Sequence, residues 1–186
     1  MLLLVGLGNP TPNSHNNRHN IGFKIVDAIN QKFGLSKQKP KFKGLLTTGN
    51  IGDKKIYAIK PLTFMNNSGI CIRELLEYFK IDAEDVIVFR DDLDIEFGKI
   101  KAKFGGSSAG HNGIASIDKF IGKEYSRVRI GIGKPENKIS VSDYVLNDFN
   151  EDKQVHLDSI TSNIIESLTI LIDKKLDLFS STVNNN

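Results

Sequence analysis

The chain has 186 residues, of which 39% are hydrophobic and 25% charged, and its formal net charge at neutral pH is +3. This length is typical of one globular domain that can bury a substantial core, so we expect a single domain over residues 1–179. The single cysteine, Cys71, excludes an intramolecular disulfide and a cysteine metal cluster, while the small positive charge permits a nucleic-acid partner without indicating one.

An apolar segment at residues 2–7 opens the chain. It is too short to span a membrane, has no basic region before it, and ends in glycines and a proline, so we interpret it as a first buried strand. Together with the single cysteine, which suits a reducing compartment, this predicts a cytoplasmic protein without a membrane partner.

Short apolar runs bounded by turn residues predict further strands, and apolar stripes at helical spacing predict helices between them. The expected strands lie at residues 56–59, 86–89, 99–103 and 128–132, with a hairpin turn at 52–53, and the expected helices at 21–33, 72–79 and 114–121. Strands that alternate with helices indicate an α/β sandwich.

Two segments lie outside this alternation. The basic stretch at residues 37–43 is interpreted as a solvated connection. A last apolar stripe at residues 151–179 predicts one or two C-terminal helices packed on the body. Residues 180–186 are expected to be a frayed tail.

Polar residues that follow strand candidates mark a candidate site, because ligands in open α/β sheets bind beyond the carboxyl ends of the strands. Asn9 follows the first strand, and Asp91 ends the strand at 86–89. His19 precedes the first helix, where it can accept a proton from water if a carboxylate fixes its tautomer. Asp91 is the best-placed carboxylate, although a histidine at a helix start is more often a cap or a surface residue.

Three asparagines near strand ends, Asn9, Asn66 and Asn112, can donate hydrogen bonds to a carbonyl or to the oxyanion that forms when the carbonyl is attacked. Each of them alone is more typical of a turn. Their positions at three strand ends favour a common site.

Basic residues alternate with apolar residues in two segments. Lys99, Lys101 and Lys103 form the first set, and Arg127 and Arg129 form the second. The alternation predicts strands with one basic face, which is either a solvated sheet face or a phosphate-binding surface.

Three other patterns suggest different chemistry. Residues 106–110 match a serine nucleophile elbow around Ser108, and His156 follows in the order that such hydrolases need. The carboxylates Asp91, Asp92, Asp94 and Glu96 offer oxygen ligands for a hard cation, although a strand would point neighbouring side chains to opposite faces. Residues 6–8 begin a dinucleotide fingerprint, but its third glycine is replaced by Thr11, so we reject a nicotinamide site.

Six motifs in chain order resemble those of bacterial peptidyl-tRNA hydrolases. They are GLGNP at 6–10, RHNIG at 18–22, TFMNNSG at 63–69, DDLD at 91–94, GGSSAGHNG at 105–113 and RIGIGKP at 129–135. The resemblance implies a single-domain, three-layer α/β/α fold with a mixed twisted sheet and C-terminal helices. It further implies a monomeric esterase without metal or cofactor, which cuts the bond between a peptide's carboxyl group and the terminal ribose of tRNA.

The same resemblance implies roles for individual residues. His19 is expected to be the general base that activates water, and Asp91 to orient it and supply charge. The expected contacts to the substrate are Asn9, Ser14, Phe64, Met65, Asn66, His111 and Asn112, with Lys103 and Arg129 clamping tRNA phosphate. The resemblance implies no such phosphate-binding role for Lys99, Lys101 and Arg127.

The chain departs from the family's pattern at several positions. Ser14 replaces a usual tyrosine, Arg90 a frequent histidine and Ala109 a usual glycine, while Asn17 and the 11–12 turn also differ. These changes bear on substrate positioning more than on the chemistry. Two rival functions stay open: a Ser108-dependent esterase, and a non-catalytic RNA-binding relative of the same fold.

Overall fold

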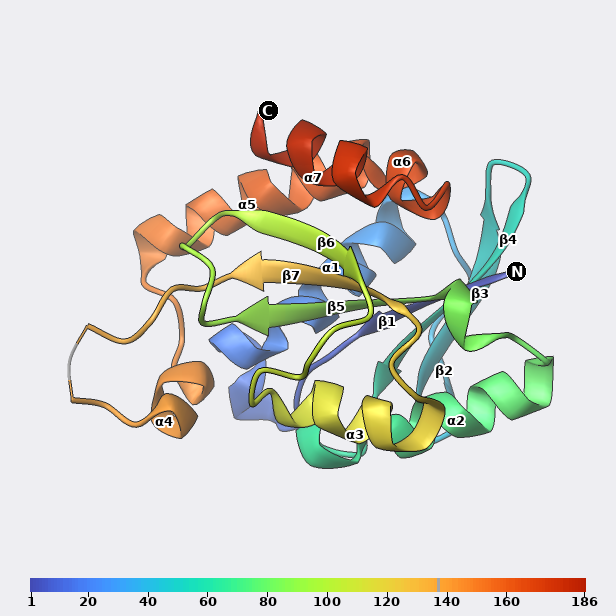
Figure 1. Cartoon of the computed structure of the whole chain (residues 1–186), viewed down its shortest axis with the longest axis horizontal. Coiled ribbons are helices and arrows are strands. Elements are labelled where there is room, and N and C mark those ends of the chain that lie inside the picture. The colour runs from blue at the N-terminus through green and yellow to red at the C-terminus, as the bar shows by residue number, and fades with distance from the viewer. Residues whose placement is uncertain (137) are drawn as a thin grey trace.

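A mixed seven-stranded sheet forms the centre of the chain in a computed structural model that describes residues 1–136 and 138–186 (Figure 1). Its strand order is β2-β3-β4-β1-β5-β7-β6. The strands are β1 (Leu2–Gly6), β2 (Lys39–Lys41), β3 (Gly44–Ile51), β4 (Lys54–Pro61), β5 (Val86–Asp92), β6 (Ile100–Phe104) and β7 (Ser126–Gly131). Strands β4, β1, β5 and β7 run parallel, and the three others run antiparallel to their neighbours.

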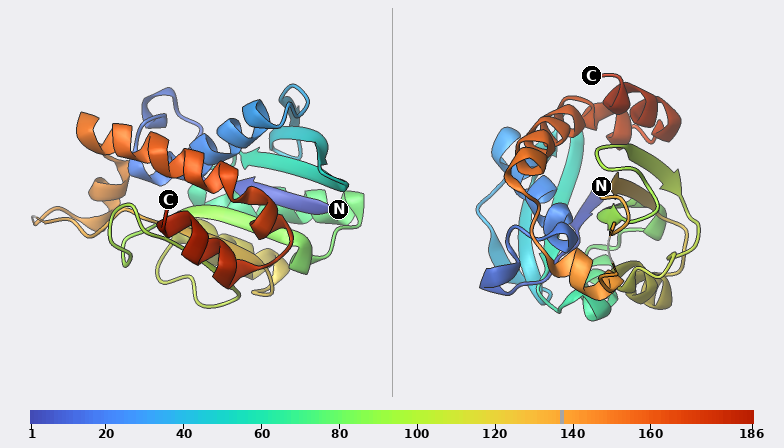
Figure 2. Two further views of the ribbon diagram at one scale, coloured as in Figure 1. Left: turned by 90° about the horizontal axis from the view of Figure 1, so that it is seen from above. Right: turned by 90° about the vertical axis from the view of Figure 1, so that its left-hand side faces the viewer.

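Helices cover both faces of this sheet. One face carries α1 (Ile21–Lys32), α5 (Glu151–Glu166), α6 (Leu168–Ile172) and α7 (Leu176–Asn184), and the other carries α2 (Ser68–Phe79) and α3 (Asn112–Ile121) (Figure 2). Every residue of β1 is buried, with Leu2 and Leu4 in the first core and Leu3 and Val5 in the second. A strand that is apolar on both faces requires cover on both, which explains the three layers. The predicted α/β/α sandwich is therefore confirmed.

The carboxyl ends of the four parallel strands meet at one edge of the sheet, where β5 and β7 point toward α4 (Val141–Leu146) in Figure 1. The short turns η2 (Arg18–Asn20) and η3 (Met65–Asn67) lie next in sequence to α1 and α2 and bring their side chains to this edge. The backbones of β1 and α1 touch here, because a Cβ on Gly6 would lie 2.2 Å from the carbonyl oxygen of Gly22. Glycine at both positions therefore brings the start of α1, and His19 just before it, against the sheet.

The structure corrects three expectations. Residues 39–41 are an edge strand paired with β3 and not a solvated connection. The C-terminal segment forms three helices, and α7 continues to Asn184 where a frayed tail was expected from residue 180. The end of α7 is ordered because Val183 is buried and Asn184 exchanges hydrogen bonds with both backbone groups of Ile100 in β6. None of the described helices is both long enough and apolar enough to cross a bilayer.

Candidate active site

A cavity of about 680 Å³ opens at the carboxyl edge of the sheet. The turns η2 and η3, the end of β5, the segment before α3 and helix α4 all contribute side chains to it. Most of the predicted site residues line it, namely Asn9, His19, Phe64, Met65, Asn66, Asp91, His111 and Asn112. These residues come from distant parts of the sequence, and the fold brings them to one edge of the sheet, where the strand-end rule had pointed for Asn9, Asn66 and Asp91.

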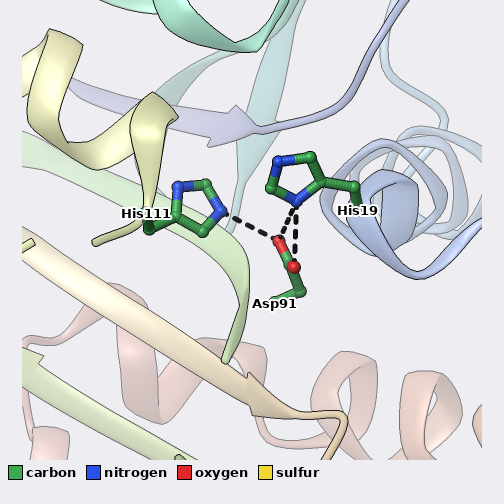
Figure 3. Close-up of side chains that lie close together, drawn as sticks. All are labelled: His19, Asp91 and His111. Carbon is green, nitrogen blue, oxygen red and sulfur yellow. Dashed lines mark hydrogen bonds and ion pairs between the residues drawn. The ribbon is translucent and has the colours of Figure 1, made fainter. Parts of the chain in front are cut away.

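A histidine and a carboxylate are paired at the centre of this cavity (Figure 3). The Nδ1 of His19 lies 2.9 Å from both carboxylate oxygens of Asp91. Since a carboxylate only accepts hydrogen bonds, Nδ1 carries the hydrogen and donates it. The other ring nitrogen, Nε2, is then free to accept a proton and points away from Asp91 in Figure 3.

A second histidine binds the same carboxylate from the other side. The Nε2 of His111 lies 2.9 Å from Oδ1 of Asp91, while its Nδ1 accepts hydrogen bonds from the backbone of Gly113 and Ile114. Because Nδ1 is an acceptor that caps the start of α3, the hydrogen must be on Nε2. Both ring nitrogens of His111 are occupied, so His111 holds Asp91 in place, and Nε2 of His19 is the ring nitrogen of this cluster that stays open to a proton.

Burial and charge set the ionisation of this cluster. Burial alone would raise the pKa of Asp91, but electrostatic attraction to the His111 and His19 rings and the hydrogen bonds from them outweigh it and hold that pKa well below its usual range. Burial lowers the pKa of His111, against the opposing attraction of Asp91. At neutral pH the cluster therefore contains an ionised Asp91 and a neutral His111.

The lowered pKa of His111 predicts a loss of stability in mild acid. Its ordinary value is 6.5, so the unfolded chain binds a proton there at a pH where the folded chain does not. The stabilising contribution is complete above pH 6.5 and is lost as the pH falls through the folded pKa. We expect the free energy of unfolding in urea, measured from pH 7.5 downward, to fall less steeply in His111→Asn, which keeps a helix cap. Equal slopes in both proteins would contradict the assignment.

The same cluster fits hydrogen bonding better than metal binding. One ligand atom each from His19, Asp91 and His111 lies within 4.8 Å of the others. An imidazole ligates a metal through a nitrogen without hydrogen, yet the nitrogens that face Asp91 are both donors. Freeing Nε2 of His111 would move its hydrogen to Nδ1, against the two backbone N–H groups that Nδ1 accepts.

An asparagine amide is oriented toward the same space. The Oδ1 of Asn9 accepts a hydrogen bond of 2.9 Å from the backbone of Met65, and the backbone of Asn9 exchanges two hydrogen bonds with the side chain of Asn20. Since Oδ1 is occupied, the NH2 group of Asn9 is the end available to the cavity. Asn66 and Asn112 lie on the cavity lining with exposed side chains.

The two arginines of β7 have different environments. Arg127 is 2% exposed and donates hydrogen bonds to Asp118 of α3 and to the carbonyl oxygen of Ser107. Arg129 is partly exposed and donates through Nε to Asp92 at 2.7 Å. Lys103 is exposed on neighbouring β6. Arg127 therefore supports the loop before His111, while Lys103 and Arg129 stay accessible to a ligand.

Two parts of the site were not among the predicted site residues: Arg90, which the sequence marked only as a departure from the family's pattern, and an apolar wall. Arg90 lines the cavity beside Asp91, and Leu93, Val141, Val145 and Leu146 form apolar lining. An arginine within a buried strand was the available signal for Arg90, because a buried charge needs a partner. The six residues of α4 are too few to show helical periodicity, which explains why this part of the wall was missed.

Several candidate residues lie away from the cavity. Ser14 is buried, is not part of the lining, and shares a hydrogen bond with Thr11. His156 packs on Phe97 from α5, whereas Ser108 precedes α3 on the opposite face of the sheet. The structure therefore does not pair Ser108 with His156. Asp91 and Asp92 point to different partners, as the alternation predicted, so the proposed carboxylate cluster does not converge.

Comparisons with known proteins agree with this geometry. The family model described as peptidyl-tRNA hydrolase matches residues 3–186. A peptidyl-tRNA hydrolase of Pelagibacter ubique is 81% identical over 185 residues, covering 100% of both chains, and one of Ehrlichia canis is 44% identical over 98% of this chain and 94% of its own. The crystal structure of peptidyl-tRNA hydrolase from Acinetobacter baumannii superposes with a TM-score of 0.92 at 34% identity, covering 99% of this chain and 94% of that one.

Proposed function

The chain belongs to the peptidyl-tRNA hydrolase family, and from this premise we propose that it releases tRNA from peptidyl-tRNA by hydrolysing the ester with a water that His19 activates. One observation supports this mechanism above the others. The Nδ1 of His19 donates to both oxygens of Asp91, which leaves Nε2 as a proton acceptor in the cavity. A base held in one tautomer by a buried carboxylate is what general-base catalysis requires.

The proton and the bonds are accounted for by these groups. Nε2 of His19 takes a proton from water as the water oxygen attacks the ester carbonyl, and the tetrahedral intermediate collapses by breaking the bond to the ribose oxygen. That oxygen takes the proton back from His19. Asp91 stays ionised throughout and stabilises the imidazolium that forms between the two steps.

Amide donors stabilise the charge that develops on the carbonyl oxygen. The NH2 group of Asn9 is the best placed, because Met65 fixes its orientation before substrate binds. Asn66 and Asn112 contribute further donors from the cavity lining, and Phe64 and Met65 contact the substrate from η3 and the residue before it. Ser14 is left out of the proposed site, because it does not reach the lining.

Phosphates of the tRNA bind outside the cavity. Lys103 and Arg129 are accessible basic residues on neighbouring strands, and Arg129 adjoins the cavity through Asp92, which lines it. Phosphate contacts position a nucleic acid without reading its sequence, which suits an enzyme that accepts many tRNAs. Peptidyl-tRNA forms where translation takes place, so we place the reaction in the cytoplasm, and we expect a monomer.

The proposal is tested by release of a labelled N-acetyl-aminoacyl group from tRNA in the presence of a chelator. We expect turnover by the intact protein and, within about twofold, by Ser108→Ala, since general-base attack by water forms no covalent serine intermediate. Loss of turnover in Ser108→Ala would indicate the serine esterase. Binding of tRNA without release of label would indicate an RNA-binding relative, and activity lost to the chelator would indicate a metal.

A further inference from the structure

A buried arginine, Arg90, connects the catalytic end of β5 to the accessible basic residues of β6 and β7, Lys103 and Arg129. Nη1 of Arg90 donates a hydrogen bond of 2.8 Å to the backbone carbonyl of Asp91 and lies 3.0 Å from Oδ2 of Asp92. The same Oδ2 accepts a hydrogen bond of 2.7 Å from Nε of Arg129. One carboxylate oxygen is therefore shared by two guanidinium groups.

The charges of this cluster do not cancel. Asp92 carries one negative charge, and its side chain is 1% exposed, so water does little to screen it. Arg129 alone beside that carboxylate would form a neutral pair. With Arg90 present, two positive charges face the one negative charge of Asp92, and these three side chains together carry a net charge of about +1 at neutral pH. The ionised Asp91 also acts on Arg90, but its carboxylate is bound by His19 and His111.

Only one of the two arginines is exposed enough to offer this positive charge to a ligand. The side chain of Arg90 is 4% exposed, whereas that of Arg129 is 26% exposed. The β-sheet register places Arg90 beside Arg129 and Arg129 beside Lys101, so these three side chains point to the same face. Arg129 bonds Asp92 through Nε, which leaves its two terminal NH2 groups for a ligand.

We propose that Arg90 is a positioning residue that balances the charge of Asp92. The positive charge of Arg129 is then not offset by Asp92, and its terminal donors are available to the phosphate backbone of tRNA. The proposal rests on the phosphate role of Arg129 given under the proposed function. It explains why a second cation stands in a buried strand immediately before the catalytic carboxylate. Without Arg90, the negative charge of Asp92 would be offset by the positive charge of Arg129 alone, and the two side chains would form a neutral pair.

The first test compares Arg90→Gln with Arg90→Lys in the release assay. Gln removes the charge and Lys keeps it. We expect KM to rise roughly tenfold in Arg90→Gln, with a salt dependence of kcat/KM shallower by about one phosphate contact, and kcat to change little. Arg90→Lys should keep KM within about threefold of the intact protein. A purely structural role would lower the urea midpoint of Arg90→Gln while leaving its KM and salt dependence unchanged, and that result would overturn the proposal.

The second test asks whether Arg90 acts through Asp92. With Asp92→Asn as background, there is no charge to balance, so adding Arg90→Gln should leave KM unchanged. The same rise in KM in both backgrounds would overturn the proposal, because Arg90 would then act independently of Asp92. This comparison also covers the case in which Arg90→Gln alone fails to fold, since Asn at position 92 removes the unbalanced charge.

Arg129→Gln separates the two proposals from each other. If KM and the salt dependence are unchanged in Arg129→Gln, the phosphate role of Arg129 itself fails. If Arg129→Gln raises KM but Arg90→Gln does not, only the inference about Arg90 fails. The inference about Arg90 is supported if KM rises in both Arg129→Gln and Arg90→Gln, and if the rise caused by Arg90→Gln disappears in the Asp92→Asn background.

Discussion

The His19→Ala variant is expected to lose about 10²-fold to 10⁴-fold in kcat while keeping its fold. The reason is that, among the described residues, Nε2 of His19 is the proposed base that Asp91 holds toward the cavity, since both nitrogens of His111 are occupied. The fold should persist because Asp91 keeps its hydrogen bond to His111. Single-turnover release of the labelled group measures the chemical step, and circular dichroism with urea unfolding measures the fold.

His156→Ala is the matched control. His156 is an exposed histidine on α5 that contacts Phe97, so its loss should change kcat by less than about twofold. If His19→Ala kept kcat within a few-fold of the intact protein, another base would have to activate the water. If His156→Ala were the inactive variant, the pairing with Ser108 would have to be reconsidered.

The sheet and most of its helices could be predicted from the sequence because apolar periodicity is a local property. Residues 39–41 carry no apolar alternation, so nothing local marked β2 as a strand, and its identity depends on pairing with β3. The order of residues 180–184 depends on Asn184 bonding to Ile100, which lies 84 residues earlier in the chain. Contacts of this range are invisible to any window along the sequence.

The sequence could predict which residues lie in the site, but it predicted less well which side chains they contact. His19 and Asp91 are 72 residues apart. The strand-end rule pointed to Asp91, the position before the first helix pointed to His19, and the family resemblance also paired them. The alternation at 127–129 assigned Arg127 and Arg129 to one face but could not show that Asp118 of α3 covers Arg127. Likewise, the shared use of Asp92 by Arg90 and Arg129 depends on the register between β5 and β7.

The Asp91→Asn variant is expected to lose about 10²-fold to 10⁴-fold in kcat, as His19→Ala does, with KM little changed. An asparagine offers one acceptor oxygen and one donor NH2 group, where the carboxylate offers two acceptor oxygens to His19 and His111. His111 cannot change its tautomer, because its Nδ1 accepts from two backbone N–H groups. We therefore expect the amide oxygen to face His111 and the NH2 group to face His19.

In that arrangement Nδ1 of His19 must become the acceptor, and the hydrogen moves to Nε2, where it blocks the uptake of a proton from water. Nitrogen chemical shifts of the His19 ring report this change directly, and kcat from the release assay reports its effect. Asp94→Asn is the control, since Asp94 is an exposed neighbouring carboxylate that pairs with exposed Lys134 at 3.5 Å. A fall in kcat without a change of tautomer would mean that Asp91 acts through its charge on the imidazolium, whereas an unchanged kcat would remove Asp91 from the mechanism.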